Sequence, residues 1–571
     1  MKRVASVIAF WGAFLLAGAA GFGQTPKIAA DLKNADSKDI VQVIVQFDKD
    51  PTDVYHQKIL SRGGTLRAML HSVRGASYTL PAAALAELAH DPSVVHISQD
   101  HRVFAKLDYT AAAINAPAAW QLGWTGTGVG VALVDSGVSL DQDLAERNVV
   151  YQQNLLPAEA GSGAYDRYGH GMHIAGIIAS NGASSSCGNC TRTLKGMAPN
   201  ANLINVRVLD ENGESTDSTV IAGIETAIQL KDKYNIRVMN LSLGRPVYES
   251  YKVDPLCQAV EAAWKAGIVV VVAAGNEGRD NAAGTNGYGT ITAPGNDPFV
   301  ITVGAMKTMG TYERSDDLIA SYSSKGPTPI DDIVKPDIVA PGNRVVSLLA
   351  PGNPTLEAAA GSQGQVPYGY YENPAEKGVS NRYLVLSGTS MAAGVVSGAV
   401  ADLLQAQPGL TPDQVKGLLM QTAYKVFPQS SVATDPVTGI SYTSYYDVFT
   451  RGAGYLDLGA ALQSRAPAAG VSALSPAVTY SSLTGRPYLV FEGGSLWSRA
   501  EQMDSAWTSR LTWAAVGVDA ERSLWSESAA WAARTIWNAS HTGAERSMWG
   551  ESMTPGSGQS PDSSVMVTGE P

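Results

Sequence analysis

The central part of the chain, residues 107–465, predicts an α/β fold in which helices flank a parallel sheet. Two observations carry this prediction. Apolar runs rich in Val and Ile recur without alternation, as expected for strands that are buried on both faces, at 129–134, 201–209, 238–243, 268–274 and 300–303. Helical patterns separate several of these runs, at 218–230, 256–265 and 391–405.

Length and composition restrict the possible classes of protein. At about 150 residues per domain, a chain of 571 residues holds three to four domains. A net charge of −11 excludes a general nucleic-acid binder, because phosphate binding needs a basic surface. A hydrophobic content of 45% excludes wholesale disorder. Three cysteines are too few for a disulfide scaffold or a four-cysteine zinc site.

Residues 1–23 have the order of an export signal. Lys2 and Arg3 precede an apolar run at 4–17, and the small residues at 17–19 form a cleavage box. The alternative is an uncleaved anchor, since the run extended to Gly23 is nearly long enough to span a bilayer. No later segment has eighteen consecutive apolar residues. We expect a secreted or extracytoplasmic protein.

A small α+β unit is predicted for residues 31–106. The segment 41–47 alternates as a strand does, 82–89 has the pattern of a short helix, and 94–97 has that of a second strand. A domain of this size is only marginally stable when it stands alone.

The last part, residues 466–571, carries a tryptophan repeat. Six tryptophans share a six-residue register that skips two positions: Trp507, Trp513, Trp525, Trp531, Trp537 and Trp549. A six-residue step returns to the same face of a strand, whereas on a helix it scatters the rings. We therefore expect a strand-built stack or a surface-binding tail. A largely disordered, low-complexity tail is the alternative, and the Gly/Ser/Pro-rich stretch from Thr554 favours disorder at its end.

Three polar residues stand where chemistry is expected in such a fold. Asp135 ends an apolar strand in VDSG, His170 begins a helix in YGHGMHIAG, and Ser390 precedes an apolar helix in SGTSMAA. The carboxyl ends of parallel strands meet at one crevice. Each residue alone has an ordinary explanation, as a turn residue, a local hydrogen-bond partner or a helix cap.

Together these segments resemble the subtilisin-like (S8) serine peptidases over residues 107–465. The order Asp135, His170, Ser390 is that of subtilisin and differs from that of chymotrypsin. Two more segments match: AAGNEG at 273–278, the family's oxyanion-hole motif, and MNLSLG at 239–244, its substrate-pairing strand. Residues 31–106 resemble the family's inhibitory propeptide, down to DPSVVHI at 91–97.

The resemblance implies a role for each matching residue. Ser390 would be the nucleophile, His170 the general base and acid, and Asp135 the group that orients the imidazole. The Asn276 amide and the Ser390 backbone N–H would stabilise the oxyanion. Substrate would pair with the main chain of five residues: Ser242, Leu243, Gly244, Ala274 and Gly275. A loose alignment also places Thr292 at the floor of a mid-sized, uncharged pocket.

Several other residues are expected to have structural roles rather than roles in the chemistry. His173 lies on the same helical face as His170, but no third ligand cluster is evident, so we assign it to packing and hydrogen bonding. A disulfide between Cys187 and Cys190 is expected for an exported protein, with Cys257 left buried in a helix. No cofactor is expected for the chemistry. The family implies structural calcium, and Asp143 resembles one ligand, but no site is assigned.

Two positions depart from the family pattern. Met172 stands where the family usually has Thr, and Gly394-Val395 where it has Pro-His. Neither position carries the chemistry, although Met172 adjoins the His170 region and bears on how that imidazole packs. The GTGVG segment at 126–130 precedes its strand, so it is not a dinucleotide loop.

The sequence as a whole predicts a secreted, monomeric serine endopeptidase that acts on proteins or peptides. Residues 31–106 would inhibit it until self-cleavage between Phe104 and Thr110. A surface-binding protein that uses the Trp-repeat tail, with the peptidase fold as a weakly active or inactive scaffold, is the alternative. A transferase or ligase with the same triad is a weaker one.

Overall fold

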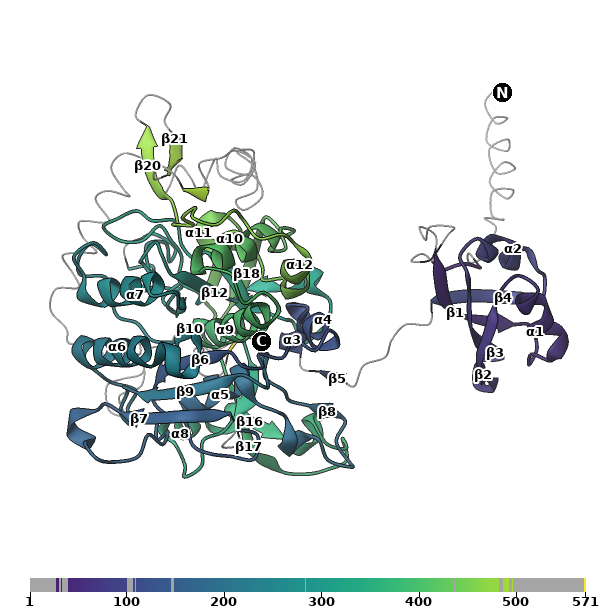
Figure 1. Cartoon of the computed structure of the whole chain (residues 1–571), viewed down its shortest axis with the longest axis horizontal. Coiled ribbons are helices and arrows are strands. Elements are labelled where there is room, and N and C mark those ends of the chain that lie inside the picture. Colours follow the sequence, from purple (N-terminus) through teal and green to yellow (C-terminus); the bar gives the residue numbers. More distant parts are fainter. Residues whose placement is uncertain are drawn as a thin grey trace, which may run out of the picture. The chain divides into compact units, whose positions relative to one another are not determined.

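The computed structural model describes residues 27–29, 32, 39–99, 106–107, 109–144, 148–282, 284–435, 438–481, 486–491, 495–496 and 569–570 (Figure 1). The expected export signal and the tryptophans of the six-residue register lie outside these residues. The chain divides into two compact units, Met1–Phe104 and Ala105–Pro571. No helix of the described residues is long and apolar enough to cross a membrane.

The first unit is a four-stranded antiparallel sheet with two helices, as the α+β prediction requires. The sheet order is β2-β3-β1-β4. Every second residue of β1 is buried, from Val43 to Phe47, and these side chains form one core with Ile59 and Leu85 of the helices. The elements are β1 (Ile40–Phe47), α1 (Asp53–Leu60), β2 (Thr65–Leu70), β3 (Gly75–Pro81), α2 (Ala84–His90) and β4 (Val94–Gln99).

The second unit is built on a mostly parallel sheet with the order β13-β12-β11-β10-β6-β9-β7, to which β14 adds beside β12. Only the β12–β13 pair is antiparallel. All residues of β6, β11 and β12 are buried, which explains their continuous apolar runs. The strands are β6 (Gly130–Asp135), β7 (Val149–Asn154), β9 (Asn202–Arg207), β10 (Ile236–Leu241), β11 (Val269–Ala273), β12 (Ile301–Lys307), β13 (Leu318–Ile319) and β14 (Ile338–Pro341).

Helices cover this sheet in two pairs. Helices α6 (Asp217–Tyr234) and α7 (Pro255–Lys265) pack together and against the sheet, and α5 (His170–Ala179) packs with α9 (Thr389–Ala406) (Figure 1). Helix α9 is the central one, because every residue from Thr389 through Leu404 is buried. At Gly394 an added Cβ would lie 3.3 Å from the side chains of Ile174 and Ile177 on α5, so glycine at this position allows the two helices to pack closely.

The remaining elements lie around this framework. The helices are α3 (Tyr109–Ala113), α4 (Ala116–Gln121), α8 (Thr355–Gly364), α10 (Pro412–Thr422), α11 (Val448–Arg451) and α12 (Leu458–Gln463). The strands are β5 (Lys106–Leu107), β8 (Arg192–Thr193), β15 (Val345–Leu348), β16 (Gln365–Pro367), β17 (Val379–Leu386), β18 (Ser430–Thr434), β19 (Ser441–Tyr445), β20 (Ala477–Ser481) and β21 (Arg486–Val490).

Candidate active site

Three neighbouring strands deliver the site residues to one edge of the sheet. Strand β10 is paired in parallel with β6 on one side and with β11 on the other. Asp135 is the last residue of β6, Ser242 follows β10, and Asn276 follows β11. Since parallel strands end at the same edge, the topology brings these three positions close together.

Asp135 and His170 form a buried pair. The Asp135 Oδ1 atom lies 2.8 Å from His170 Nδ1, and both side chains are 1% exposed. The same oxygen accepts the Ser136 backbone N–H at 2.7 Å, which fixes the carboxylate beside the end of its strand. Against an ionised carboxylate, Nδ1 carries the proton, and the pair thereby sets the tautomer of the imidazole.

The start of α5 holds His170 against the end of β6. The Gly171 N–H donates to Ser136 Oγ at 2.9 Å. An added Cβ on Gly171 would overlap the Gly137 carbonyl oxygen, so only glycine permits this close approach. Met172 is fully buried in the core next to this contact, and the Asp135–His170 bond is formed with methionine in that place.

Asp166 is a positioning residue that the sequence reasoning missed. Its buried carboxylate accepts the Ser136 hydroxyl at 2.9 Å and three backbone N–H groups at the start of α5, those of Tyr168, Gly169 and Met172. Burial raises the pKa of Asp166, and nearby Asp135 raises it further, whereas the backbone donors lower it. Asp166 lies four residues before α5, whose N-cap position is Gly169, so no local capping pattern marks it in the sequence.

Ser390 lies in the first turn of α9 and faces the segment after β10. Its side chain is buried, and its hydroxyl donates to the Ser242 carbonyl oxygen at 3.2 Å. The Ser242 hydroxyl returns a bond to the Ser390 carbonyl oxygen at 2.9 Å. Gly388, just before the helix, has φ 151° and ψ 161°, a conformation that side-chain-bearing residues rarely adopt. The predicted nucleophile and the predicted substrate strand are therefore in direct contact.

Asn276 is tied to the same turn through Thr389. The Asn276 Oδ1 atom accepts the Thr389 backbone N–H at 2.9 Å and its hydroxyl at 3.1 Å. The Thr389 hydroxyl oxygen also lies 3.2 Å from both the N–H and the carbonyl oxygen of Gly275. Because the amide oxygen is held in this way, the Nδ2 donor is the end of the side chain that is left for a ligand.

The other predicted substrate-binding residues surround Thr292. A Cβ on Gly244 would lie 2.7 Å from Thr292 Oγ1, and one on Gly275 would lie 2.9 Å from Thr292 Cγ2. The Thr292 N–H donates to the Ala274 carbonyl oxygen at 3.1 Å. Leu243 is 3% exposed and belongs to the core. The two candidate substrate segments thus lie on either side of a partly exposed threonine.

His173 is a structural histidine, as expected. It is fully buried, and its Nε2 donates to the carbonyl oxygens of Val345 and Leu384 at 3.2 and 3.1 Å. Burial, together with nearby His170, lowers the pKa of His173 to about 3, so the imidazole is neutral in the folded protein. Within the described ranges, no three His, Cys, Asp or Glu side chains are grouped as a metal site.

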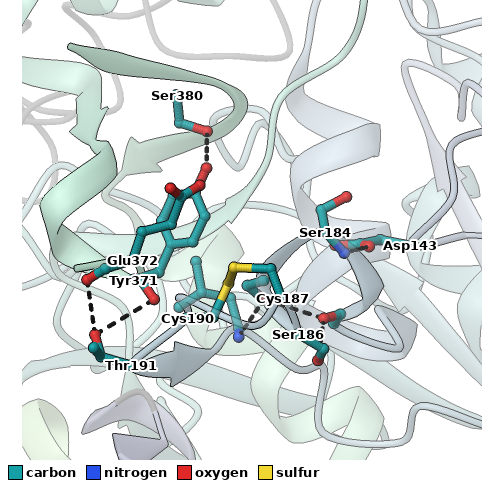
Figure 2. The surroundings of a disulfide bond; sticks show 12 residues. Asp143, Ser184, Ser186, Cys187, Cys190, Thr191, Tyr371, Glu372 and Ser380 are labelled. Carbon is teal, nitrogen blue, oxygen red and sulfur yellow. Dashed lines mark hydrogen bonds between the residues drawn. A yellow bond between two sulfur atoms is a disulfide. The ribbon is translucent and has the colours of Figure 1, made fainter. Parts of the chain in front are cut away.

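The Cys187–Cys190 disulfide is present and closes the loop after α5 (Figure 2). In the same loop the Ser184 N–H donates to Asp143 Oδ1 at 2.5 Å. The other oxygen of Asp143 accepts the Tyr383 hydroxyl at 2.8 Å. Both oxygens of Asp143 therefore accept hydrogen bonds from the protein. Cys257 is buried in α7, as predicted.

The comparisons with known proteins agree with this geometry. The model of the Subtilase family of S8 peptidases matches residues 126–452, more than half of the chain. The chain belongs to the subtilase family. It is 37% identical to the serine protease AprX of Bacillus subtilis over 392 residues, which cover 66% of this chain and 82% of AprX.

A second relative, subtilisin E of Bacillus subtilis, is 34% identical over 368 residues, 64% of this chain and 79% of subtilisin E. The alkaline protease of Alkalihalobacillus alcalophilus is 28% identical over 406 residues, 71% of this chain and 85% of that protease. This subtilase is a serine-type endopeptidase with a buried Asp135–His170 pair, and proteins or peptides are its substrates.

Proposed function

We propose that this subtilase is exported and hydrolyses peptide bonds through an acyl-enzyme on Ser390. The supporting observation is the buried 2.8 Å contact between Asp135 and His170 at the start of α5, the helix that packs against the Ser390 helix α9. The two helix starts carry the base and the nucleophile of the proposed reaction.

The proposed acylation begins with a proton transfer. Asp135 keeps the proton on His170 Nδ1, which leaves Nε2 as the basic nitrogen. The Ser390 hydroxyl turns from the Ser242 carbonyl oxygen to His170 Nε2, which takes its proton as Ser390 Oγ attacks the scissile carbonyl. His170 then returns that proton to the leaving amine. Water, activated by the same base, releases the acyl group and restores the serine.

The oxyanion of each tetrahedral intermediate needs donors that are fixed in advance. Thr389 holds the Asn276 oxygen, so the Asn276 Nδ2–H group is the side-chain donor, and the Ser390 backbone N–H is the second. Substrate would extend between 242–244 and 274–275 and pair with both main chains. Thr292, which lies against Gly244 and Gly275, would form the floor of a mid-sized, uncharged pocket for the residue before the cleaved bond.

We further propose that the enzyme is made as a zymogen whose residues 31–106 act as an intramolecular inhibitor. The small antiparallel domain and the 91–97 motif support this role. The Lys2–Arg3 start followed by an apolar run supports export through residues 1–23, and so does the disulfide, because disulfides persist in oxidising compartments. We expect the mature enzyme to act as a monomer without bound nucleic acid or a chemical cofactor.

The Ser390→Ala variant tests the proposal. We expect it to accumulate as a folded precursor that retains residues 31–106, whereas the unaltered chain is cut between Phe104 and Thr110. Intact-mass measurement of the purified protein reports the cut. Maturation of Ser390→Ala at the normal rate without another protease would refute self-processing. Casein digestion by the processed protein, abolished by a serine-directed covalent inhibitor, tests hydrolysis separately.

A further inference from the structure

Residues 569–570 lie in a buried site of the peptidase unit. The side chain of Glu570 is 1% exposed. The described residue that precedes Gly569 in the chain is Leu496. One carboxylate oxygen accepts the Ser321 N–H at 2.8 Å and lies 3.1 Å from Arg279 Nη2. The other lies 2.9 Å from Lys307 Nζ. The Ser321 hydroxyl also donates to the first oxygen.

The site also binds the main chain of Glu570, in addition to its carboxylate. The Glu570 N–H donates to Asn343 Oδ1 at 2.8 Å, and Asn343 Nδ2 donates to the Glu570 carbonyl oxygen at 2.9 Å. Gly569 has φ +78°, and a Cβ there would lie 2.6 Å from Arg344 Cγ and overlap the Ser387 hydroxyl. A Gly-Glu pair therefore fits the site in both shape and hydrogen bonding.

Four separate segments of the chain contribute side chains to the Glu570 site. The burial of Glu570 is therefore not the result of a single contact at the surface. Arg279 follows β11, Lys307 ends β12, Ser321 follows β13, and Asn343 lies between β14 and β15. Each of these four side chains is less than a tenth exposed.

Charge balance explains why a carboxylate is the ligand. Arg279 is also paired with Asp435 at 3.0 Å, so that carboxylate accounts for one of the two buried positive charges. Glu570 supplies the second carboxylate, opposite Lys307. A buried cation is strongly destabilising when its partner is removed. Burial opposes ionisation of Glu570, but Lys307, Ser321 and Arg279 outweigh it and lower the pKa of Glu570.

The chain before residue 497 is fixed on the same unit. The Leu496 N–H donates to the Ser472 carbonyl oxygen at 2.7 Å, and its 3% exposed side chain belongs to the main core. We propose that Arg279, Lys307, Ser321 and Asn343 form a binding site for the Gly569-Glu570 segment of this chain. Leu496 and the Gly569-Glu570 segment then both bind to the peptidase unit.

Trimming by an added carboxypeptidase tests this site without relying on peptidase activity. The full chain is prepared in the Ser390→Ala background, so that self-digestion does not interfere, and removal of residues 571 to 569 is followed by intact mass. We expect the parent to be trimmed about tenfold or more slowly than a synthetic peptide of residues 565–571, because the bound end must first leave a charge-assisted site.

Two variants of the segment and one of its site should abolish this protection. Glu570→Gln removes the charge, Gly569→Ala keeps it but does not fit, and Lys307→Gln alters the site itself; each rate is compared with that of the matching synthetic peptide. Glu376→Gln, at an exposed glutamate, should behave as the parent does. The proposal is overturned if the parent is trimmed as fast as its peptide, or if the three variants remain as protected as the parent. Because trimming is measured in the Ser390→Ala background, its outcome does not depend on the proposed hydrolysis, which casein digestion by the unaltered enzyme tests separately.

Discussion

Replacing Asn276 by leucine removes the proposed oxyanion donor and leaves the nucleophile and base in place. Loss of one such donor typically lowers kcat by about 10²–10³, which corresponds to about 2.7–4 kcal/mol of transition-state stabilisation. KM should change little, because the donor acts mainly on charge that develops during the reaction.

The structural cost of this substitution is expected to be smaller. The Asn276 oxygen accepts two hydrogen bonds from Thr389, at 2.9 and 3.1 Å, and the side chain is only partly buried. A hydrogen bond contributes about 0.5–1.5 kcal/mol net, and water can replace part of a partly exposed one. Destabilisation of this size leaves the protein folded at the assay temperature, so it does not account for a loss of kcat of two or three orders of magnitude.

Steady-state hydrolysis of a chromogenic peptide anilide, with thermal unfolding measured on the same preparations, separates the two effects. Asn276→Asp is the matched variant, because it keeps the oxygen that Thr389 binds and replaces the donor with a second acceptor. Both variants should lose kcat with similar KM. Retention of more than about a tenth of kcat by Asn276→Leu would refute the role of donor, since typical losses are larger.

Two further predictions concern residues that support the site. Asp166→Asn should lower the free energy of unfolding by about 1–3 kcal/mol and reduce kcat more than it changes KM. The reason is that the new amide cannot accept every backbone N–H at the start of α5. Denaturant unfolding measures the first effect, and steady-state kinetics measure the second. His173 is neutral when folded, with a pKa of about 3, and titrates near 6.5 when unfolded. Below pH 6.5 the unfolded chain therefore binds a proton that the folded chain does not, and stability falls by about 1.4 kcal/mol per pH unit as the pH drops toward 3. His173→Gln should remove about 2 kcal/mol of the stability lost between pH 7 and pH 5, measured by denaturant unfolding in the Ser390→Ala background.

Each of these predictions has its own control. For Asp166, the matched substitution is Asp316→Asn at an exposed carboxylate, which should change neither quantity; equal losses in both variants would contradict a positioning role. For His173, the slope of the unfolding free energy against pH is compared between the parent and His173→Gln. Burial raises the pKa values of Asp297 and Asp317 to about 7, so these two carboxyl groups change the stability in the opposite direction. Their contribution is the same in the parent and in the variant, and the difference in slope reports His173. Identical slopes with and without His173 would contradict the assigned burial of a neutral imidazole.

The sequence predicted the sheet strands that have long apolar runs, and it missed β7 and β14 for different reasons. Runs of Val and Ile placed β6, β9, β10, β11 and β12 to within a few residues. Strand β7 was not predicted, because most of its residues are half-buried or exposed and it lacks a continuous apolar run. Strand β14 has only four residues and ends in Pro341, a residue that ordinarily argues against a strand.

The candidate site was predictable where a residue type coincided with the end of an element. Asp135 at a strand end and His170 at a helix start are of this kind, and the structure joins them. Asp166 required knowing that a loop carboxylate returns to cap α5. The contact of Glu570 with Lys307 joins residues more than 250 positions apart and is specified only by the folded chain. Local patterns contain no information about such a contact.

Helix α9 links the chemistry of this enzyme to its global stability. Its first turn carries Ser390, and its next four turns are enclosed by the sheet and by α5. Such a segment opens only at a free energy close to that of complete unfolding, whereas exposed loops open at much lower cost. Heating should therefore leave turnover intact until the whole peptidase unit melts, so that inactivation and unfolding follow a single curve.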